Sequence, residues 1–173
     1  MGLASDLSYA FPRANWFQRA VKAFASTRPG AWVFSKFLRH LDDLVQKLTR
    51  GRTTAPEVLA GLPVLDVTTT GRKSGQPRTS HLISIPIGDT LALLGTNFGQ
   101  PGTPAWALNL EANPKATVRY RDRSASVTAR PATEAEFAQV LASSGPIYPG
   151  YRKYHHRVGE RRRVRIFVLE PAA

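Results

Sequence analysis

The sequence contains no cysteine among its 173 residues. Disulfides, thiolate nucleophiles and cysteine-ligated zinc are therefore excluded. Acidic residues are also scarce, since 12 Asp and Glu stand against 24 Lys and Arg and leave a formal net charge of +12. A chain this basic attracts anions, and these can be nucleic acid, anionic lipid or a phosphorylated small molecule. Charge alone does not choose among these partners.

Long apolar runs are missing as well. No stretch reaches the ~18 uninterrupted apolar residues that a membrane-spanning helix needs. Residues 1–10 contain Asp6 and lack the basic start and apolar centre of a secretion signal. These absences favour a cytoplasmic protein. A hydrophobic share of 42% with a charged share of 21% indicates a globular chain rather than a disordered one.

Residues 11–50 are predicted to be helical. Apolar residues from Trp16 to Phe24 are spaced for one face of a helix, and the break at 27–30 separates them from a second apolar stripe at 33–48. Such amphipathic helices pack onto the domain or a partner subunit, or lie on a membrane surface. Both interpretations stay open. We divide the chain into a helical extension with linker, residues 1–60, and a second domain, residues 61–173.

The second domain is predicted to be mainly β with inserted helices. Strands are expected at 64–70, 79–87, 91–96, 116–120, 125–130 and 164–169, with hairpin turns at Gly88-Asp89 and Asp122-Arg123. One helix is expected to open at Thr103-Pro104, with Thr103 as its N-cap. A capping box of Thr133 and Glu136 predicts another helix that runs to about Leu141. About six short, largely antiparallel strands favour a small barrel over a parallel sheet.

The most informative local feature is the loop at residues 71–78, which lies between two predicted strands. It places Arg72, Lys73 and Arg78 close together, and Gly71 and Gly75 permit tight turns. Arg offers a planar fork of donors for phosphate or carboxylate, and Lys adds a point charge. Spacing alone leaves two interpretations open, an anion site and a solvated basic hairpin.

Two aromatic features accompany this loop. Tyr148, Tyr151 and Tyr154 recur at steps of three, which places their rings on one side of a helix. Trp106 lies in the helix that opens after a glycine-rich loop, where backbone amides form a natural anion site. Ordinary packing explains both patterns equally well at this point. The histidines do not form a metal set, and no nucleophile elbow is present.

Several separate runs resemble, in the same order, those of the deazaflavin-dependent nitroreductase family of actinobacteria, whose members bind coenzyme F420. The resemblance extends from about residue 62 to 171. The matching runs are residues 68–78, 104–106, 109–114, 127–130, 148–151 and 168–171.

The resemblance implies a split β-barrel of the FMN-binding type and a binding role for the basic loop. Arg72, Lys73 and Arg78 would hold the phosphate and glutamate tail of the coenzyme. The backbone of residues 94–97 would run along the deazaflavin ring. The cofactor-binding set that it implies is Arg72, Lys73, Ser74, Gln76, Pro77, Arg78, Leu94, Gly95, Thr96, Asn97, Ala105 and Trp106.

On the substrate side, the resemblance implies catalytic or substrate-contacting roles for four residues. They are Tyr148, Tyr151, Tyr154 and Thr96. Thr96 stands where the nitroimidazole-reducing member has serine. Asn97 stands where that member has lysine, and Phe98 where glycine is usual, so substrate choice or cofactor contacts are expected to differ.

The implied activity is hydride transfer from reduced F420 to a quinone, a nitroaromatic compound or a similar electron-poor acceptor. An FMN-dependent oxidoreductase stays open because both cofactors offer a phosphate to the loop. A non-catalytic deazaflavin carrier also stays open. Nucleic-acid binding is disfavoured because the strands lack interleaved aromatic and basic residues. Peripheral contact with the inner face of the cell membrane and a homodimer are further expectations.

Overall fold

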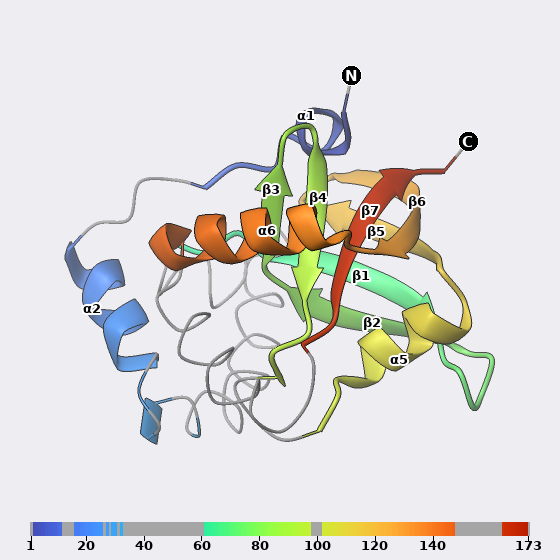
Figure 1. The fold of residues 1–173 in the computed structure, drawn as a ribbon, viewed down its shortest axis with the longest axis horizontal. Coiled ribbons are helices and arrows are strands. Elements are labelled where there is room, and N and C mark those ends of the chain that lie inside the picture. Colours follow the sequence, from blue (N-terminus) through green and yellow to red (C-terminus); the bar gives the residue numbers. More distant parts are fainter. Residues whose placement is uncertain are drawn as a thin grey trace.

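The fold is that of a computed structural model that describes residues 2–11, 16–25, 27, 29–30, 32, 61–97, 102–147 and 164–172. Its centre is a seven-stranded antiparallel sheet in the order β2-β1-β5-β6-β7-β4-β3 (Figure 1). The strands are β1 (Leu65–Thr70), β2 (Pro77–Leu82), β3 (Ser84–Ile87), β4 (Thr90–Leu94), β5 (Lys115–Tyr120), β6 (Arg123–Pro131) and β7 (Ile166–Pro171). The helices are α1 (Leu3–Asp6), α2 (Trp16–Ala25), α5 (Ala105–Ala112) and α6 (Glu134–Ile147).

The two edges of this sheet are neighbours in sequence. Strands β2 and β3 lie at opposite ends of the strand order, yet only Ile83 separates them. The sheet must therefore curl so that its first and last strands meet. The prediction of a single strand over 79–87 is wrong for this reason, because the chain changes partner from β1 to β4 at Ile83. The sheet thus has seven strands rather than six.

The turns follow the expected chemistry. Gly88, at a φ of 55°, opens the predicted turn between β3 and β4. The β5–β6 turn falls at Arg121 and Asp122 rather than at Asp122 and Arg123, since Arg121 has a φ of 56° and Arg123 already pairs with Tyr120. Strand boundaries elsewhere differ from the predicted ones by at most two residues, and residues 95 and 96, predicted to be in a strand, lie beyond the end of β4.

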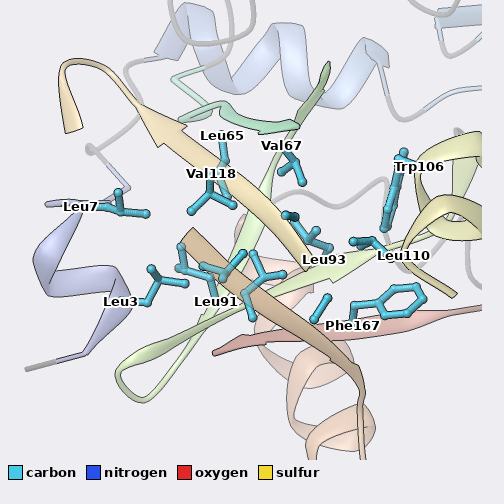
Figure 2. Close-up of a cluster of buried hydrophobic side chains, with 14 of the residues drawn as sticks. Leu3, Leu7, Leu65, Val67, Leu91, Leu93, Trp106, Leu110, Val118 and Phe167 are labelled. Carbon is cyan, nitrogen blue, oxygen red and sulfur yellow. The ribbon is translucent and has the colours of Figure 1, made fainter. Parts of the chain in front are cut away.

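Alternation of burial along the strands places the core inside the curl. Exposed and buried side chains alternate along the whole of β5. Its buried residues Val118 and Tyr120 belong to the same apolar cluster as Leu65 and Val67 of β1. Figure 2 shows Leu3 of α1 and Leu7, just after this helix, at one end of the cluster, and Trp106 and Leu110 of α5 at the other. Helix α1 was not predicted, and it is buried together with the barrel strands. The division of the chain at residue 60 stays a prediction.

The capping box predicted for α6 is confirmed. The amide of Glu136 donates to the Thr133 hydroxyl (3.3 Å), and the amide of Thr133 donates to the Glu136 carboxylate (2.8 Å). The helix continues to Ile147, six residues beyond the predicted end. Val140, which is buried, joins α6 to a second apolar cluster that contains Ile85, Leu94 and Ile166. Packing against this cluster therefore stabilises a helix that is longer than its local sequence predicts.

Helix α2 turns an apolar stripe outward. The side chains of Trp16 and Phe24 are 75% and 52% exposed, and Trp32 is exposed as well. Only its other side is buried, through Ala25 and in part Val21. Within the part of the chain that the structure describes, no helix has the length and apolar character to cross a membrane. The predicted second amphipathic helix, residues 33–48, lies outside the described residues.

Candidate functional site

The basic loop between β1 and β2 has a defined backbone. The Gly71 amide donates to the Gln76 carbonyl (2.8 Å), and the Gly75 amide donates to the Gly71 carbonyl (2.7 Å). Gly75 has a φ of 67°, a left-handed conformation that glycine adopts without strain. The Gln76 amide also donates to the Ser74 hydroxyl (3.3 Å). Ser74 and Gln76, both predicted to bind cofactor, thus help to shape the loop.

The cations of this loop differ from three arginines elsewhere on the barrel. Arg119, Arg130 and Arg165 each pair with a carboxylate. Arg72, Lys73 and Arg78 are exposed, and within the described ranges their side chains form no hydrogen bond or ion pair. Three unneutralised cations next to a tight backbone turn have the charge and geometry to bind a polyanion.

Helix α5 fixes the position of this loop. The Arg72 amide donates to the side-chain oxygen of Asn109 (3.0 Å), and the amide group of Asn109 donates to the Thr69 hydroxyl (3.0 Å). Asn109 is only 6% exposed and Thr69 only 1%. Sequence reasoning placed Asn109 in a matching run but gave it no role. Its partners lie 37 and 40 residues away, and no local pattern signals such contacts.

A second segment, residues 94–97, lies close to the start of α5. The Gly95 amide donates to the Arg165 carbonyl (2.9 Å) and extends the β4–β7 ladder by one rung. A Cβ on Gly95 would lie 3.1 Å from that carbonyl oxygen and 3.8 Å from Pro104, so glycine permits the close approach. Asn97, at a φ of 49°, donates from its side chain to the Gly102 carbonyl (3.0 Å).

The start of α5 differs from the prediction. Pro104 occupies the N-cap position and no side chain caps the helix, so the expectation that Thr103 is the N-cap is wrong. The Thr103 hydroxyl instead accepts a hydrogen bond from the Arg165 guanidinium (3.2 Å). Ala105, the first residue of the helix, is exposed. Trp106 is buried in the main core against Phe167, with ring centroids 6.1 Å apart.

Several predicted site residues thus converge on one helix. The loop 71–78 is joined to α5 through Asn109, and residues 95–97 are joined to it through Arg165 and Gly102. Leu94 and Thr96 are buried, at 8% and 4% exposed, and Pro77 is exposed at the start of β2. Tyr148, Tyr151, Tyr154 and Phe98 lie outside the described residues.

A separate charged cluster lies on the outer face of the sheet. Asp66 accepts hydrogen bonds from His81 and Arg119, its cross-strand neighbours on β2 and β5, at 2.7 Å each. Partial burial acts to raise the pKa of Asp66, but these two contacts outweigh it and hold that pKa below its ordinary value. Asp66, His81 and Arg119 are cross-strand neighbours on three adjacent strands. Their ion pairs are therefore explained by the pairing of the strands, and no ligand is needed to account for the cluster.

The geometry can be compared with known proteins. A family model described as F420H(2)-dependent quinone reductase matches residues 38–171. The chain belongs to this family. A relative in Mycobacterium tuberculosis named F420H(2)-dependent quinone reductase is 34% identical over 94 residues, which cover 54% of this chain and 62% of that protein. The chain therefore spans less than two thirds of the length of this curated relative.

Two solved structures are similar to the chain as well. One, described as an F420-H2 dependent reductase of the FDR-A type, is 29% identical with a TM-score of 0.56, and covers 62% of this chain and 94% of its own. Another, described as a domain-swapped dimer, is 26% identical with a TM-score of 0.59. The match covers 82% of this chain and 99% of the other. The predicted split-barrel fold and the resemblance to deazaflavin-dependent proteins are both confirmed.

Proposed function

We propose that the protein binds reduced coenzyme F420 and uses it to reduce a quinone. The observation that carries the proposal is the set of three unneutralised cations, Arg72, Lys73 and Arg78, on a loop anchored to α5. Membership of the F420H(2)-dependent quinone reductase family supports the choice of coenzyme and of acceptor. The same membership favours F420 over FMN as the cofactor.

The residues present fit the coenzyme by the chemistry of their donors. F420 carries a phosphate and a glutamate tail, and Arg72, Lys73 and Arg78 supply guanidinium and ammonium donors that suit both groups. Ser74, Gln76 and Pro77 complete this wall of the site. Because Asn109 already holds the loop in place, little of the binding free energy is spent on ordering it.

The remaining groups would orient the reacting partners. When bound, the reduced deazaflavin supplies a hydride. The backbone of Leu94 to Asn97 would lie along the ring, with Ala105 at the border of the cleft. Trp106 supports that border from within the core. Close approach of donor and acceptor, at about 3–3.5 Å, requires this frame to be rigid and dry.

On the substrate side, we assign Thr96 and the tyrosines. The structure describes no hydrogen bond from the Thr96 hydroxyl to another described residue, which leaves that group available to a ligand. Tyr151 would donate a proton or hydrogen bond to the oxygen of the acceptor as negative charge develops there. Tyr148 and Tyr154 would supply flat walls for a planar quinone or nitroaromatic compound.

Titration with F420, followed by fluorescence, tests the coenzyme assignment. Lys73→Ala combined with Arg78→Ala is expected to weaken coenzyme binding at least ~100-fold, because each charge-assisted contact contributes about 1.5–3 kcal/mol. Arg19→Ala combined with Lys115→Ala removes the same net charge from exposed sites elsewhere and is the matched control. Equal affinity for all three proteins would contradict the tail assignment.

The same preparation distinguishes the alternatives. Oxidation of reduced F420 by a soluble short-chain quinone, monitored by absorbance, is the expected result. Tight F420 binding without turnover against quinones or nitroaromatics would indicate a carrier. Saturable binding of FMN with none of F420 would indicate an FMN enzyme.

We also propose a peripheral contact with a membrane surface through α2. Its exposed face consists of Trp16, Arg19, Ala20, Ala23 and Phe24, which combine aromatic, small and basic residues without an acidic one. Such a face suits the headgroup region of an anionic bilayer, where apolar quinones are close at hand.

Trp16→Ala with Phe24→Ala should reduce sedimentation with anionic vesicles at least severalfold. Thr117→Ala with Ser126→Ala, at two exposed positions of the sheet, should leave sedimentation with these vesicles unchanged.

A homodimer is the second partner that we propose. The support is a structural neighbour that is described as a domain-swapped dimer. Sedimentation equilibrium across a range of protein concentrations would test it, and a single monomer mass at all concentrations would contradict it.

A further inference from the structure

Arg165 precedes β7 and touches three parts of the candidate site at once. We propose that Arg165 is a positioning residue that holds the segment Gly95–Asn97 at a set distance from α5. The inference rests on the proposed function, since that segment is assigned to the coenzyme ring, but the contacts themselves do not depend on the assignment.

Three contacts carry the inference. The Arg165 carbonyl accepts from the Gly95 amide (2.9 Å), which fixes the backbone of the ring segment. Its guanidinium donates to the Thr103 hydroxyl (3.2 Å), immediately before α5. The same group pairs with the carboxylate of Glu111, in the last turn of α5. One residue thus connects the ring segment to both ends of an eight-residue helix.

The surroundings of Gly95 leave little freedom around this connection. A Cβ on Gly95 would lie 3.1 Å from the Arg165 carbonyl oxygen, 3.7 Å from the Arg165 Cβ and 3.8 Å from Pro104. Gly95 is therefore packed between the backbone of Arg165 and the start of α5. Any displacement of Arg165 relative to α5 must move Gly95 as well, because the interior is closely packed.

Stability alone gives a poor account of this arrangement. The side chains of Arg165 and Glu111 are 37% and 39% exposed, and ion pairs this exposed contribute little to folding. Arg130 provides a comparison, because it has the same exposure and pairs with Glu136 and Glu170 away from the site. A role in stability predicts similar behaviour of the two arginines, whereas a positioning role predicts different behaviour.

The position of Arg165 also separates its effect from that of the basic loop. The loop 71–78 is anchored by Asn109, which forms no hydrogen bond with Arg165 in the described residues. Loss of the Arg165 side chain should therefore disturb the ring segment and leave the tail contacts in place. For the proposed reaction, this means slower turnover with little change in coenzyme affinity, because small misplacements of reacting atoms are costly to rate.

Arg165→Met tests the inference, and Arg130→Met is the matched control. Hydrogen exchange in the protein without coenzyme is expected to accelerate about tenfold at residues 94–97 in Arg165→Met and to remain unchanged there in Arg130→Met. In F420 assays, Arg165→Met should lower kcat about tenfold while the coenzyme Kd stays within about twofold. Arg165→Lys, which keeps the charge but not the forked geometry, should recover part of kcat.

Two results would overturn the inference. The first is exchange at residues 94–97 that is unchanged in Arg165→Met, or that rises equally in Arg130→Met. The second is a rise in coenzyme Kd with no change in kcat. If the wild-type protein does not bind F420, the proposed function fails, while the exchange experiment still decides whether Arg165 holds Gly95–Asn97 against α5.

Discussion

The side-chain oxygen of Asn109 accepts a hydrogen bond from the backbone amide of Arg72, so a buried residue of α5 holds the first cation of the basic loop. The same side chain donates to Thr69, the last buried residue of β1. Asn109 thereby ties helix, strand and loop together with two bonds. The loop is held by the interior of the protein, although its own side chains point to solvent.

Asn109→Ala should therefore damage both stability and coenzyme binding. Removal of the amide leaves the buried Thr69 hydroxyl and the Arg72 amide without these partners, which costs about 1–3 kcal/mol of folding free energy. The coenzyme Kd should rise about tenfold because the loop must then be ordered on binding. Chemical denaturation and fluorescence titration measure the two effects. Thr68→Val, which removes an exposed hydroxyl on the same strand, should change neither by more than a small amount.

Gly75→Ala tests whether the loop is preorganised by its backbone. The positive φ of Gly75 disfavours any residue with a Cβ by roughly 1–2 kcal/mol, although no atom lies close enough to clash. Coenzyme affinity should fall severalfold. Gly75→Asn should reduce coenzyme affinity less than Gly75→Ala does, because asparagine tolerates this conformation better than alanine. Equal losses in the two variants would indicate that the left-handed backbone is not the cause.

The parts of this fold that follow from local sequence were predicted well. The strand at 116–120, the turn at Gly88 and the capping box of Thr133 and Glu136 all depend on neighbours within a few residues. The change of partner at Ile83 was not predicted. It arises from closure of the sheet, and the strand 79–87 shows no break in its own pattern.

The candidate site shows the same limit. Arg72, Lys73 and Arg78 stand out because cations cluster within eight residues, and the resemblance assigned them a ligand. Asn109 and Arg165 were not predicted because the partners of their side chains are 37 to 62 residues away. A local rule predicted that Thr103 caps the helix, but its hydroxyl instead accepts a hydrogen bond from the guanidinium of Arg165, which is distant in sequence. Long-range side-chain contacts of this kind require the fold.

Tyr151→Phe tests the assignment of the proton donor. If the hydroxyl stabilises negative charge on the acceptor, its loss should lower kcat by about 10²-fold and leave coenzyme affinity unchanged. Steady-state turnover with a soluble quinone, with F420 titration alongside, measures both. Tyr148→Phe and Tyr154→Phe, proposed as walls of the pocket, should affect the quinone KM more than kcat. An unchanged kcat in Tyr151→Phe would show that its hydroxyl is dispensable.

Glu136→Gln should destabilise the protein in a way that depends on pH. Hydrogen bonds from Arg130 and from Thr133 lower the pKa of Glu136 from 4.5 to about 2. Because the folded-state pKa is the lower one, the stabilisation is complete above pH 4.5 and is lost as pH falls toward 2. At pH 7 the variant should lose up to about 1 kcal/mol, from the ion pair with Arg130, because glutamine can keep the capping hydrogen bond.

Thermal unfolding of the wild type and of Glu136→Gln between pH 7 and pH 3 measures this difference. The gap in Tm should be largest at neutral pH and shrink steadily below pH 4.5, because the carboxylate of the unfolded wild-type chain takes up a proton there while the folded one stays ionised down to about pH 2. Glu134→Gln provides the control, since Glu134 is exposed in the same helical turn and does not pair with Arg130. A gap for Glu136→Gln that stays constant across this range would mean that the carboxylate charge does not stabilise the fold. The contribution of Glu136 would then come only from the shape and hydrogen bonding of its side chain, which glutamine retains in part.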